Sequence, residues 1–123
     1  MMKLILTIIF SLFMVVPQDN DPNLATGNWE GKIEGPGVSL KIVFHVINQE
    51  GVLSATMDSP EQDAFGYKMD EVKFSDNVLE MSIKQFGGTY KGTLKEGKFE
   101  GKWTQGGQNF DLNLTRIKRT GTS

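Results

Sequence analysis

A motif that occurs three times restricts the fold more than any other feature of this sequence. Each copy places an aromatic residue, a glycine and a further apolar residue at alternate positions: WEGKI at 29–33, YKGTL at 90–94 and FEGKW at 99–103. Alternate residues of a β-strand point to the same face, so all three share one side. A glycine beside a large ring lets the ring lie over bare backbone and lets the strand coil sharply. The motif is therefore typical of small, tightly curved antiparallel barrels.

The N-terminal residues resemble an export signal. Lys3 supplies a positive charge, and residues 4–16 (LILTIIFSLFMVV) are apolar apart from one threonine and one serine. This run is shorter than the roughly 20 residues of a membrane-spanning helix, and it suits a secretory signal. We predict a signal helix at residues 1–17 that is removed on export to the periplasm or the cell exterior, with no stable membrane insertion after cleavage. An uncleaved membrane anchor is the alternative.

Length and composition predict a single domain and exclude several classes of site and partner. The chain has 123 residues, enough for a single core. We divide it into the signal peptide (1–17), a flexible lead-in (18–26), a β-barrel domain (27–118) and a tail (119–123). The absence of cysteine excludes a lipoprotein anchor, disulfides and thiolate metal sites. A net charge of −2, with no basic block before residues 116–119, argues against a nucleic-acid partner.

Turn signals recur at short spacing from residue 27 onward. They separate segments in which apolar and polar residues alternate, which indicates antiparallel strands joined by hairpins. The sequence therefore predicts an all-β protein, a small antiparallel meander β-barrel of roughly eight or nine strands with a filled or small-ligand interior. Alternation breaks in residues 67–74 near Glu71, and we expect a β-bulge there. The turn signals lie at 34–37, 48–51, 75–77, 87–88, 95–97 and 106–107.

Arg116 is the one charged residue on the predicted inward face of the last strand, after Phe110, Leu112 and Leu114. A guanidinium in that place needs a partner, and the face of a tryptophan ring attracts it. The first and last strands of a closed meander are neighbours, so Trp29 is the natural partner. The alternative is an arginine that extends into solvent from the strand end.

Two resemblances to known families follow from these residues. Gly27-Asn28-Trp29 together with the late Arg116 resembles the Gly-x-Trp and C-terminal arginine pattern of lipocalin-like (calycin) barrels. The segments at 55–62, 65–66 and 101–107 (GKWTQGG) resemble a secreted bacterial β-domain of unknown function that is often found ahead of a serine α/β-hydrolase domain. The second resemblance implies an accessory role. No Gly-x-Ser-x-Gly motif exists in this chain, so hydrolase activity is not carried over.

The segment at 58–63 (DSPEQD) interrupts the strand pattern and is the first candidate site. Asp58 and Ser59 can accept hydrogen bonds from backbone amides that follow, and Pro60 sets φ for a turn. The structural interpretation is an ordered turn or a single helical turn that closes one mouth of the barrel. The functional interpretation is a binding loop in which Asp58, Ser59 and Gln62 face a ligand, joined by Trp103 and Gln105 from the end of a late strand.

Catalysis and metal binding find little support in the sequence. His45 is the only histidine, and a triad with Ser59 and either Asp58 or Asp111 can be written down. Alternation points His45 outward, because Phe44 and Val46 point inward, and nothing marks an oxyanion hole. One histidine among scattered carboxylates does not form a metal-binding pattern. We therefore expect no enzyme activity and no cofactor.

Two functions remain. In the first, the chain is an exported, non-catalytic barrel that binds a small apolar or amphipathic ligand. In the second, it is an accessory domain with a filled interior that docks a partner protein such as a secreted hydrolase. The inward-facing methionines and phenylalanines fit core filling, and they also fit the lining of an apolar cavity. The abundance of both large residues and glycines leaves the choice open.

Overall fold

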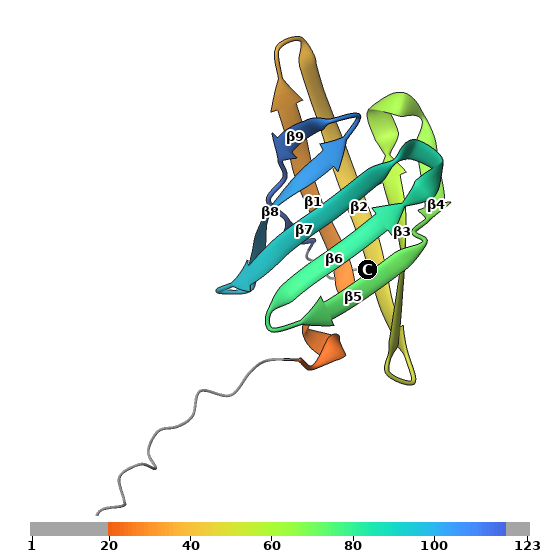
Figure 1. The fold of residues 1–123 in the computed structure, drawn as a ribbon, viewed down its shortest axis with the longest axis vertical. Coiled ribbons are helices and arrows are strands. Elements are labelled where there is room, and N and C mark those ends of the chain that lie inside the picture. Colours follow the sequence, from red (N-terminus) through yellow and green to blue (C-terminus); the bar gives the residue numbers. More distant parts are fainter. Residues whose placement is uncertain (1–19, 118–123) are drawn as a thin grey trace, which may run out of the picture.

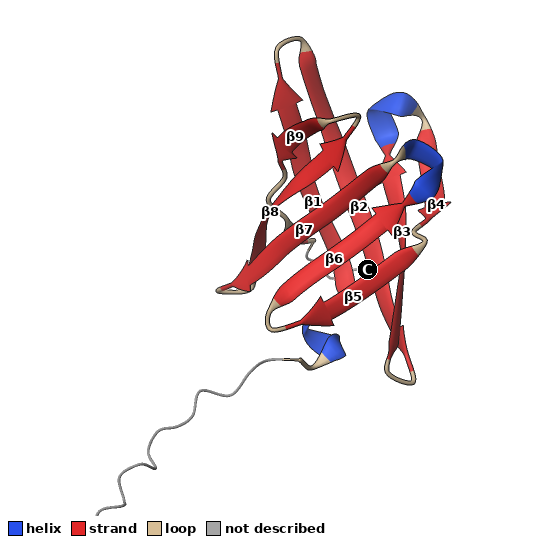
Figure 2. Ribbon diagram, viewed as in Figure 1, coloured by secondary structure: helices blue, strands red, loops and turns tan. Residues whose placement is uncertain are grey.

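Ten β-strands make up most of the structure, a computed structural model that describes residues 20–117 (Figure 1). They form two five-stranded antiparallel sheets that face each other, so the predicted all-β class is confirmed (Figure 2). The predicted signal peptide at 1–17 and the tail at 119–123 lie outside the described residues. The strands are β1 (Gly27–Gly35), β2 (Val38–Gln49), β3 (Val52–Ser59), β4 (Ala64–Lys68), β5 (Glu71–Ser75), β6 (Val78–Ile83), β7 (Gly88–Lys95), β8 (Lys98–Gln105), β9 (Gln108–Asp111) and β10 (Thr115–Arg116).

The sheets follow the predicted meander closely. One has the order β10-β1-β2-β3-β4 and the other β5-β6-β7-β8-β9, so neighbouring strands are consecutive in the chain except for β10 beside β1. Three 3-10 turns join or precede the strands: η2 (Pro22–Leu24), η3 (Pro60–Gln62) and η4 (Lys84–Phe86). The helical turn predicted after Asp58 is η3. No helical segment among residues 20–117 is long and apolar enough to cross a bilayer.

The chain passes between the sheets at residues 69–70, where the sequence predicted a bulge near Glu71. The Met69 N–H donates to the Ala55 carbonyl on β3 at 2.9 Å, and the Asp70 N–H donates to the Ser82 carbonyl on β6 at 2.7 Å. Two adjacent residues thus bond to different sheets. The bulge prediction was wrong here, because the alternation breaks when the chain changes sheets. The register shift that the structure does contain lies between Met57 and Ser59, in the β3–β4 pair.

A second corner joins the two sheets at residues 112–116. The Leu112 N–H donates to the Gly101 carbonyl, and Leu114 exchanges two backbone hydrogen bonds with Phe99 on β8. Two residues later, β10 pairs with β1 and places Arg116 opposite Trp29. The sequence predicted one closed barrel, whereas the structure has two sheets connected at two corners.

The core lies between the sheets and consists of the predicted inward faces. The Trp29 ring meets the Phe99 ring edge-on, with centroids 4.7 Å apart, and so joins β1 to β8 across the interior. Burial of such large apolar side chains is the main stabilising term in a small domain. The largest fully buried side chains are Trp29, Phe44, Leu79, Met81, Ile83, Tyr90, Phe99, Leu112 and Leu114.

Two of the three glycines of the repeated motif fill the role expected of them. A Cβ on Gly92 or Gly101, which pair across β7 and β8, would collide with the Tyr90 side chain, and a Cβ on Gly88, which lies outside the motif, would collide with the Trp103 ring. Both rings therefore lie against bare backbone. Tyr90 is 1% exposed, and its hydroxyl has no hydrogen-bond partner among the described residues. Burial raises the pKa of Tyr90 far above its ordinary value.

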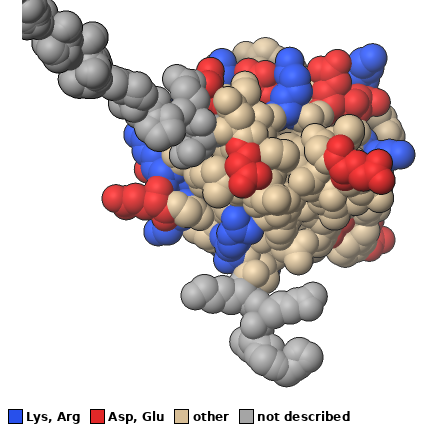
Figure 3. Space-filling view, turned by 90° about the horizontal axis from the view of Figure 1, so that it is seen from below, with Lys and Arg blue, Asp and Glu red and all other residues tan. Residues whose placement is uncertain are grey.

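The end of the barrel-like core near η2 is closed by residues that the sequence predicted to be a flexible lead-in. Ala25 is fully buried, and its carbonyl accepts a hydrogen bond of 2.9 Å from the Trp29 indole Nε1–H. The guanidinium carbon of Arg116 lies 4.3 Å from the centre of the Trp29 ring, so the predicted contact is present. Arg116 itself is exposed at the strand end, and it covers the ring from outside the core. Seen from this end, acidic and basic side chains are interspersed (Figure 3).

Candidate functional site

A pocket of about 290 Å³ opens between the two sheets at the end opposite η2. The ends of β3 and β8, the β1–β2 hairpin and the turns η3 and η4 surround it, and Figure 2 shows both turns at this end. The pocket walls combine side chains from both sheets. Its volume lies at the lower edge of the roughly 300–1,000 Å³ range of small-molecule sites.

Apolar side chains line most of the pocket. Ile42 and Met57 from one sheet and Trp103 from the other are buried, so they form an apolar base. Tyr67 on β4 meets Phe86 on η4 edge-to-face with ring centroids 5.0 Å apart, and this pair closes one side. Apolar walls of this kind favour an apolar body in a ligand.

Three polar residues complete the lining, and each was predicted from the sequence. Ser59 is 3% exposed, and its hydroxyl donates to Gln62 Oε1 at 2.7 Å. The Trp103 Nε1–H donates to Gln105 Oε1 at 2.8 Å. Four of the five predicted site residues, Ser59, Gln62, Trp103 and Gln105, therefore meet in one pocket.

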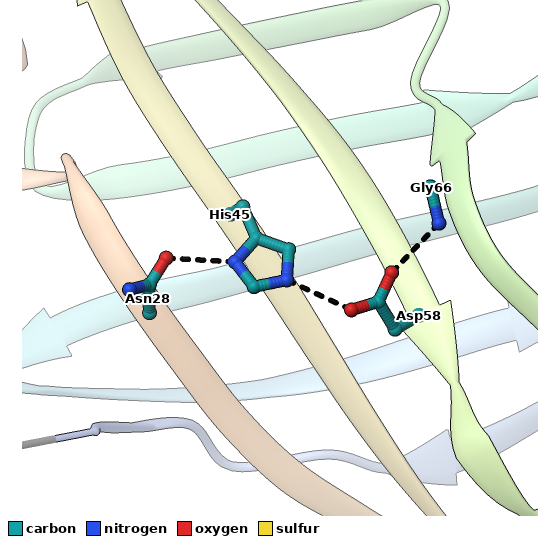
Figure 4. Close-up of polar contacts among 4 residues, drawn as sticks. All are labelled: Asn28, His45, Asp58 and Gly66. Atoms are coloured by element: carbon teal, nitrogen blue, oxygen red, sulfur yellow. Dashed lines mark hydrogen bonds and ion pairs between the residues drawn. The ribbon is translucent and has the colours of Figure 1, made fainter.

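Asp58, the fifth predicted residue, does not line the pocket. It lies on the outer face of the first sheet, where Oδ1 accepts a hydrogen bond of 2.7 Å from the Gly66 N–H and Oδ2 is 2.8 Å from His45 Nε2 (Figure 4). His45 Nδ1 lies 2.7 Å from Asn28 Oδ1, so side chains from β1, β2 and β3 form one polar chain that ends on β4. The prediction that Asp58 accepts from amides two or three residues further along was wrong, because the amide that it accepts from, that of Gly66, lies eight residues on.

The predicted outward orientation of His45 agrees with this geometry. Its side chain is 40% exposed on the outer face, whereas Ser59 points into the pocket on the inner face of the same sheet. Ser59 and His45 are separated by the sheet and cannot act as nucleophile and base. Within residues 20–117, no group of three His, Asp or Glu side chains is arranged to hold a metal ion.

The turn η3, which carries Gln62, is attached to the β1–β2 hairpin through Glu61. The pairing of β3 with β2 ends at Asp58, opposite Val43, and β2 continues past that point toward the hairpin. Glu61 Oε1 accepts the Lys41 N–H there at 2.9 Å, and this hydrogen bond lowers the pKa of the Glu61 carboxyl. At this wall of the pocket, the Glu61 carboxylate thus accepts a backbone hydrogen bond that a neighbouring strand would otherwise accept.

A second hollow of about 280 Å³ lies on the outer face of the other sheet, over β5, β6 and β7. Its lining is mostly charged or hydroxyl-bearing. Glu80 Oε1 lies 4.0 Å from Lys73 Nζ, and Glu80 Oε2 lies 3.6 Å from Lys91 Nζ. These side chains are more than 40% exposed, so the pairs are solvated and weak. This surface matches the solvated outer face expected from strand alternation.

Sequence reasoning missed Tyr67 and the polar chain on the outer face, whereas it grouped Phe86 with the phenylalanines that fill the core or line an apolar cavity. Tyr67 lies where the alternation breaks, so it carried no periodic signal. His45 and Asp58 both point outward on neighbouring strands, and this could have indicated their contact. Comparison of the chain with protein-family models, with curated proteins and with solved structures found no match.

Proposed function

We propose that this protein is an exported, non-catalytic binding module that holds a small, uncharged, amphipathic ligand in the pocket between Trp103 and Met57. The observation that carries this proposal is the pocket itself, with an apolar base and a rim of Ser59, Gln62 and Gln105. No charged side chain belongs to the described lining. A charged ligand would lose hydration there without gaining an opposite charge, so an uncharged ligand is favoured.

In this proposal the two sheets act together as a lipocalin-like barrel with one closed and one open end. The corners at residues 69–70 and 112–116 support it, because each bonds to both sheets. The Trp29–Arg116 contact and η2 cover the closed end, and the pocket occupies the other. The apolar run at residues 4–16 supports delivery of this module to the periplasm or the cell exterior.

A second candidate function is the docking of a partner protein such as a secreted hydrolase. Phe65 supports it, because this aromatic side chain is 61% exposed on β4, the edge strand beside η3. Exposed aromatic residues are frequent anchors of protein–protein contacts. We rank this function second, since the pocket accounts for more of the candidate residues than one exposed ring does.

The ligand-binding proposal is tested with N-phenylnaphthylamine, an uncharged fluorescent probe, added to the full chain. Ala64 lines the pocket, and Ala64→Phe adds a ring that occupies part of its volume. We expect the variant to bind the probe about tenfold or more weakly, a loss of about 1.4 kcal/mol. Val52→Phe is the matched control, since Val52 is 69% exposed in the β2–β3 hairpin and lines none of this pocket.

A measurement on the unsubstituted chain makes the test independent of whether Ala64→Phe folds. The probe should shift the indole N–H resonance of Trp103, which lines the pocket, and leave that of Trp29 unchanged at the other end. A probe that shifts neither resonance, or that binds both variants as tightly as the wild type, would overturn the proposal.

A further inference from the structure

The orientation of the Gln105 side-chain amide is set by Trp103. An indole N–H can only donate a hydrogen bond, so the atom it reaches at 2.8 Å must be the amide oxygen. One acceptor position of this oxygen is thereby used within the protein, and the NH₂ group lies on the other side of the amide. No described residue accepts a hydrogen bond from that nitrogen.

Gln62 repeats this arrangement on the turn η3. Its Oε1 accepts from the Ser59 hydroxyl at 2.7 Å, and Ser59 is 3% exposed. The oxygen therefore satisfies a buried donor, as buried polar groups require. The NH₂ group of Gln62 is left for a ligand, and here too no described residue accepts from it. Both glutamines line the pocket and are exposed, so each NH₂ group, a donor of two hydrogen bonds, is accessible at the rim.

We propose that this pocket selects neutral ligands whose polar end is an oxygen acceptor, such as the carbonyl of an ester, a ketone or an amide. This inference rests on the proposed ligand-binding function and adds the chemical class of the ligand. The acceptor meets the NH₂ groups of Gln62 and Gln105, while its apolar body lies against Trp103, Ile42 and Met57. A primary ammonium end would face these NH₂ groups with its own donors and would lose hydration without gaining an opposite charge.

This selectivity comes chiefly from the weak binding of ligands whose polar end does not match the rim. A ligand that leaves the rim donors unpaired loses more affinity than a matched hydrogen bond gains, because unsatisfied polar groups at an apolar site are costly. A carboxylate end finds donors at the rim but no cation among the described lining residues. The neutral carbonyl is therefore the end that meets both conditions.

The test compares methyl hexanoate, which carries only acceptors, with heptylammonium, which carries only donors and a charge. Each is titrated into the full chain labelled at tryptophan, and binding is followed by the indole N–H resonance of Trp103, with Trp29 as the internal reference. We expect methyl hexanoate to bind at least about tenfold more tightly than heptylammonium.

Gln105→Glu and Gln62→Glu reverse the preference without removing the internal contacts. A glutamate keeps the oxygen that accepts from Trp103 or Ser59, and it replaces the NH₂ donor with an acidic oxygen. We expect each variant to weaken methyl hexanoate binding about tenfold and to strengthen heptylammonium binding. Gln85→Glu is the matched control, because Gln85 is exposed on η4 and does not line the pocket.

The outcomes separate this inference from the proposed function. If neither probe shifts the Trp103 resonance, ligand binding at the pocket itself is refuted. If both bind with equal affinity, or if Gln105→Glu and Gln62→Glu behave like Gln85→Glu, the pocket binds ligands without selecting acceptors, and the inference is wrong while the function stands.

Discussion

The guanidinium of Arg116 lies 4.3 Å above the Trp29 ring and donates to the carbonyls of Leu24 and Thr26. One exposed side chain thus joins the last strand, the first strand and the turn η2. Its location explains how a fully buried tryptophan at the end of the core is kept from water. The contact combines cation–π attraction, which gains from partial desolvation, with packing of the aliphatic stem.

Arg116→Ala should lower the free energy of unfolding by about 1–2 kcal/mol, because it removes the cation–π contact and the packing of the stem. Arg116→Lys should recover part of this loss, since lysine retains the charge but not the planar fork that reaches two carbonyls. Denaturant titration followed by tryptophan fluorescence measures both. A loss near zero for Arg116→Ala would show that the arginine is merely solvated at the strand end.

Gly31→Ala should destabilise the protein by about 1–3 kcal/mol, typical of overpacking. A Cβ at Gly31 would collide with the backbone carbonyl of Asn113, which cannot move without disturbing the corner between the sheets. Gly35→Ala is the matched control on the same strand, because its Cβ would meet only Phe110 at an ordinary 4.0 Å. Equal midpoints for the two variants in thermal unfolding would contradict this prediction.

Asp58→Ala should lower the free energy of unfolding by about 1–3 kcal/mol, because it leaves the Gly66 N–H without its acceptor and removes the contact with His45 Nε2. Asp58→Asn should cost less, since its amide oxygen can still accept from Gly66. Probe affinity at the pocket should change no more than stability does, which distinguishes a supporting role from direct contact. Loss of probe binding in a fully folded Asp58→Asn protein would instead make Asp58 a ligand-binding residue.

Acidification should release the bond between Glu61 and Lys41. The Lys41 N–H lowers the pKa of Glu61 below its ordinary value of 4.5, so the carboxylate is stabilised by folding. The stabilisation is complete above the pKa of the unfolded chain and is lost as pH falls through the lowered pKa of the folded state. The Lys41 amide resonance should move with a midpoint below 4.5. Glu61→Gln keeps an acceptor that does not titrate, so its Lys41 resonance should stay constant over that range.

Features of the fold that depend on residues close together in the chain were predictable from the sequence, and features that depend on distant residues were not. Alternation and turn residues are local signals, and they predicted most strands, their inward faces and the glycines beneath Tyr90. The sheet change at Met69 depends on hydrogen bonds to Ala55 and Ser82, which are distant in the chain, so it resembled a bulge.

The candidate site shows the same limit. Four site residues were predictable, because they lie at strand ends or in a turn at the open end of the predicted barrel. They are Ser59, Gln62, Trp103 and Gln105. Asp58 was placed wrongly as a pocket residue, since a strand alternates its faces and Ser59 next to it already points inward. The donor character of the rim could not be predicted, because it depends on which amide atom meets Trp103 and Ser59.

Gly88→Ala should close the pocket more than it destabilises the fold. The Cβ of the alanine would collide with the six-membered ring of Trp103, and Gly88 lies on β7, which is paired on both sides. The β7 backbone is held by hydrogen bonds to β6 and β8, so we expect the Trp103 ring to move instead, into the open volume of the pocket. We therefore expect a smaller stability loss than for Gly31→Ala, where the obstacle is backbone, together with a clear loss of methyl hexanoate binding. Denaturant titration and the Trp103 indole resonance measure the two effects, and unchanged probe affinity in a folded Gly88→Ala protein would place the bound ligand away from this ring.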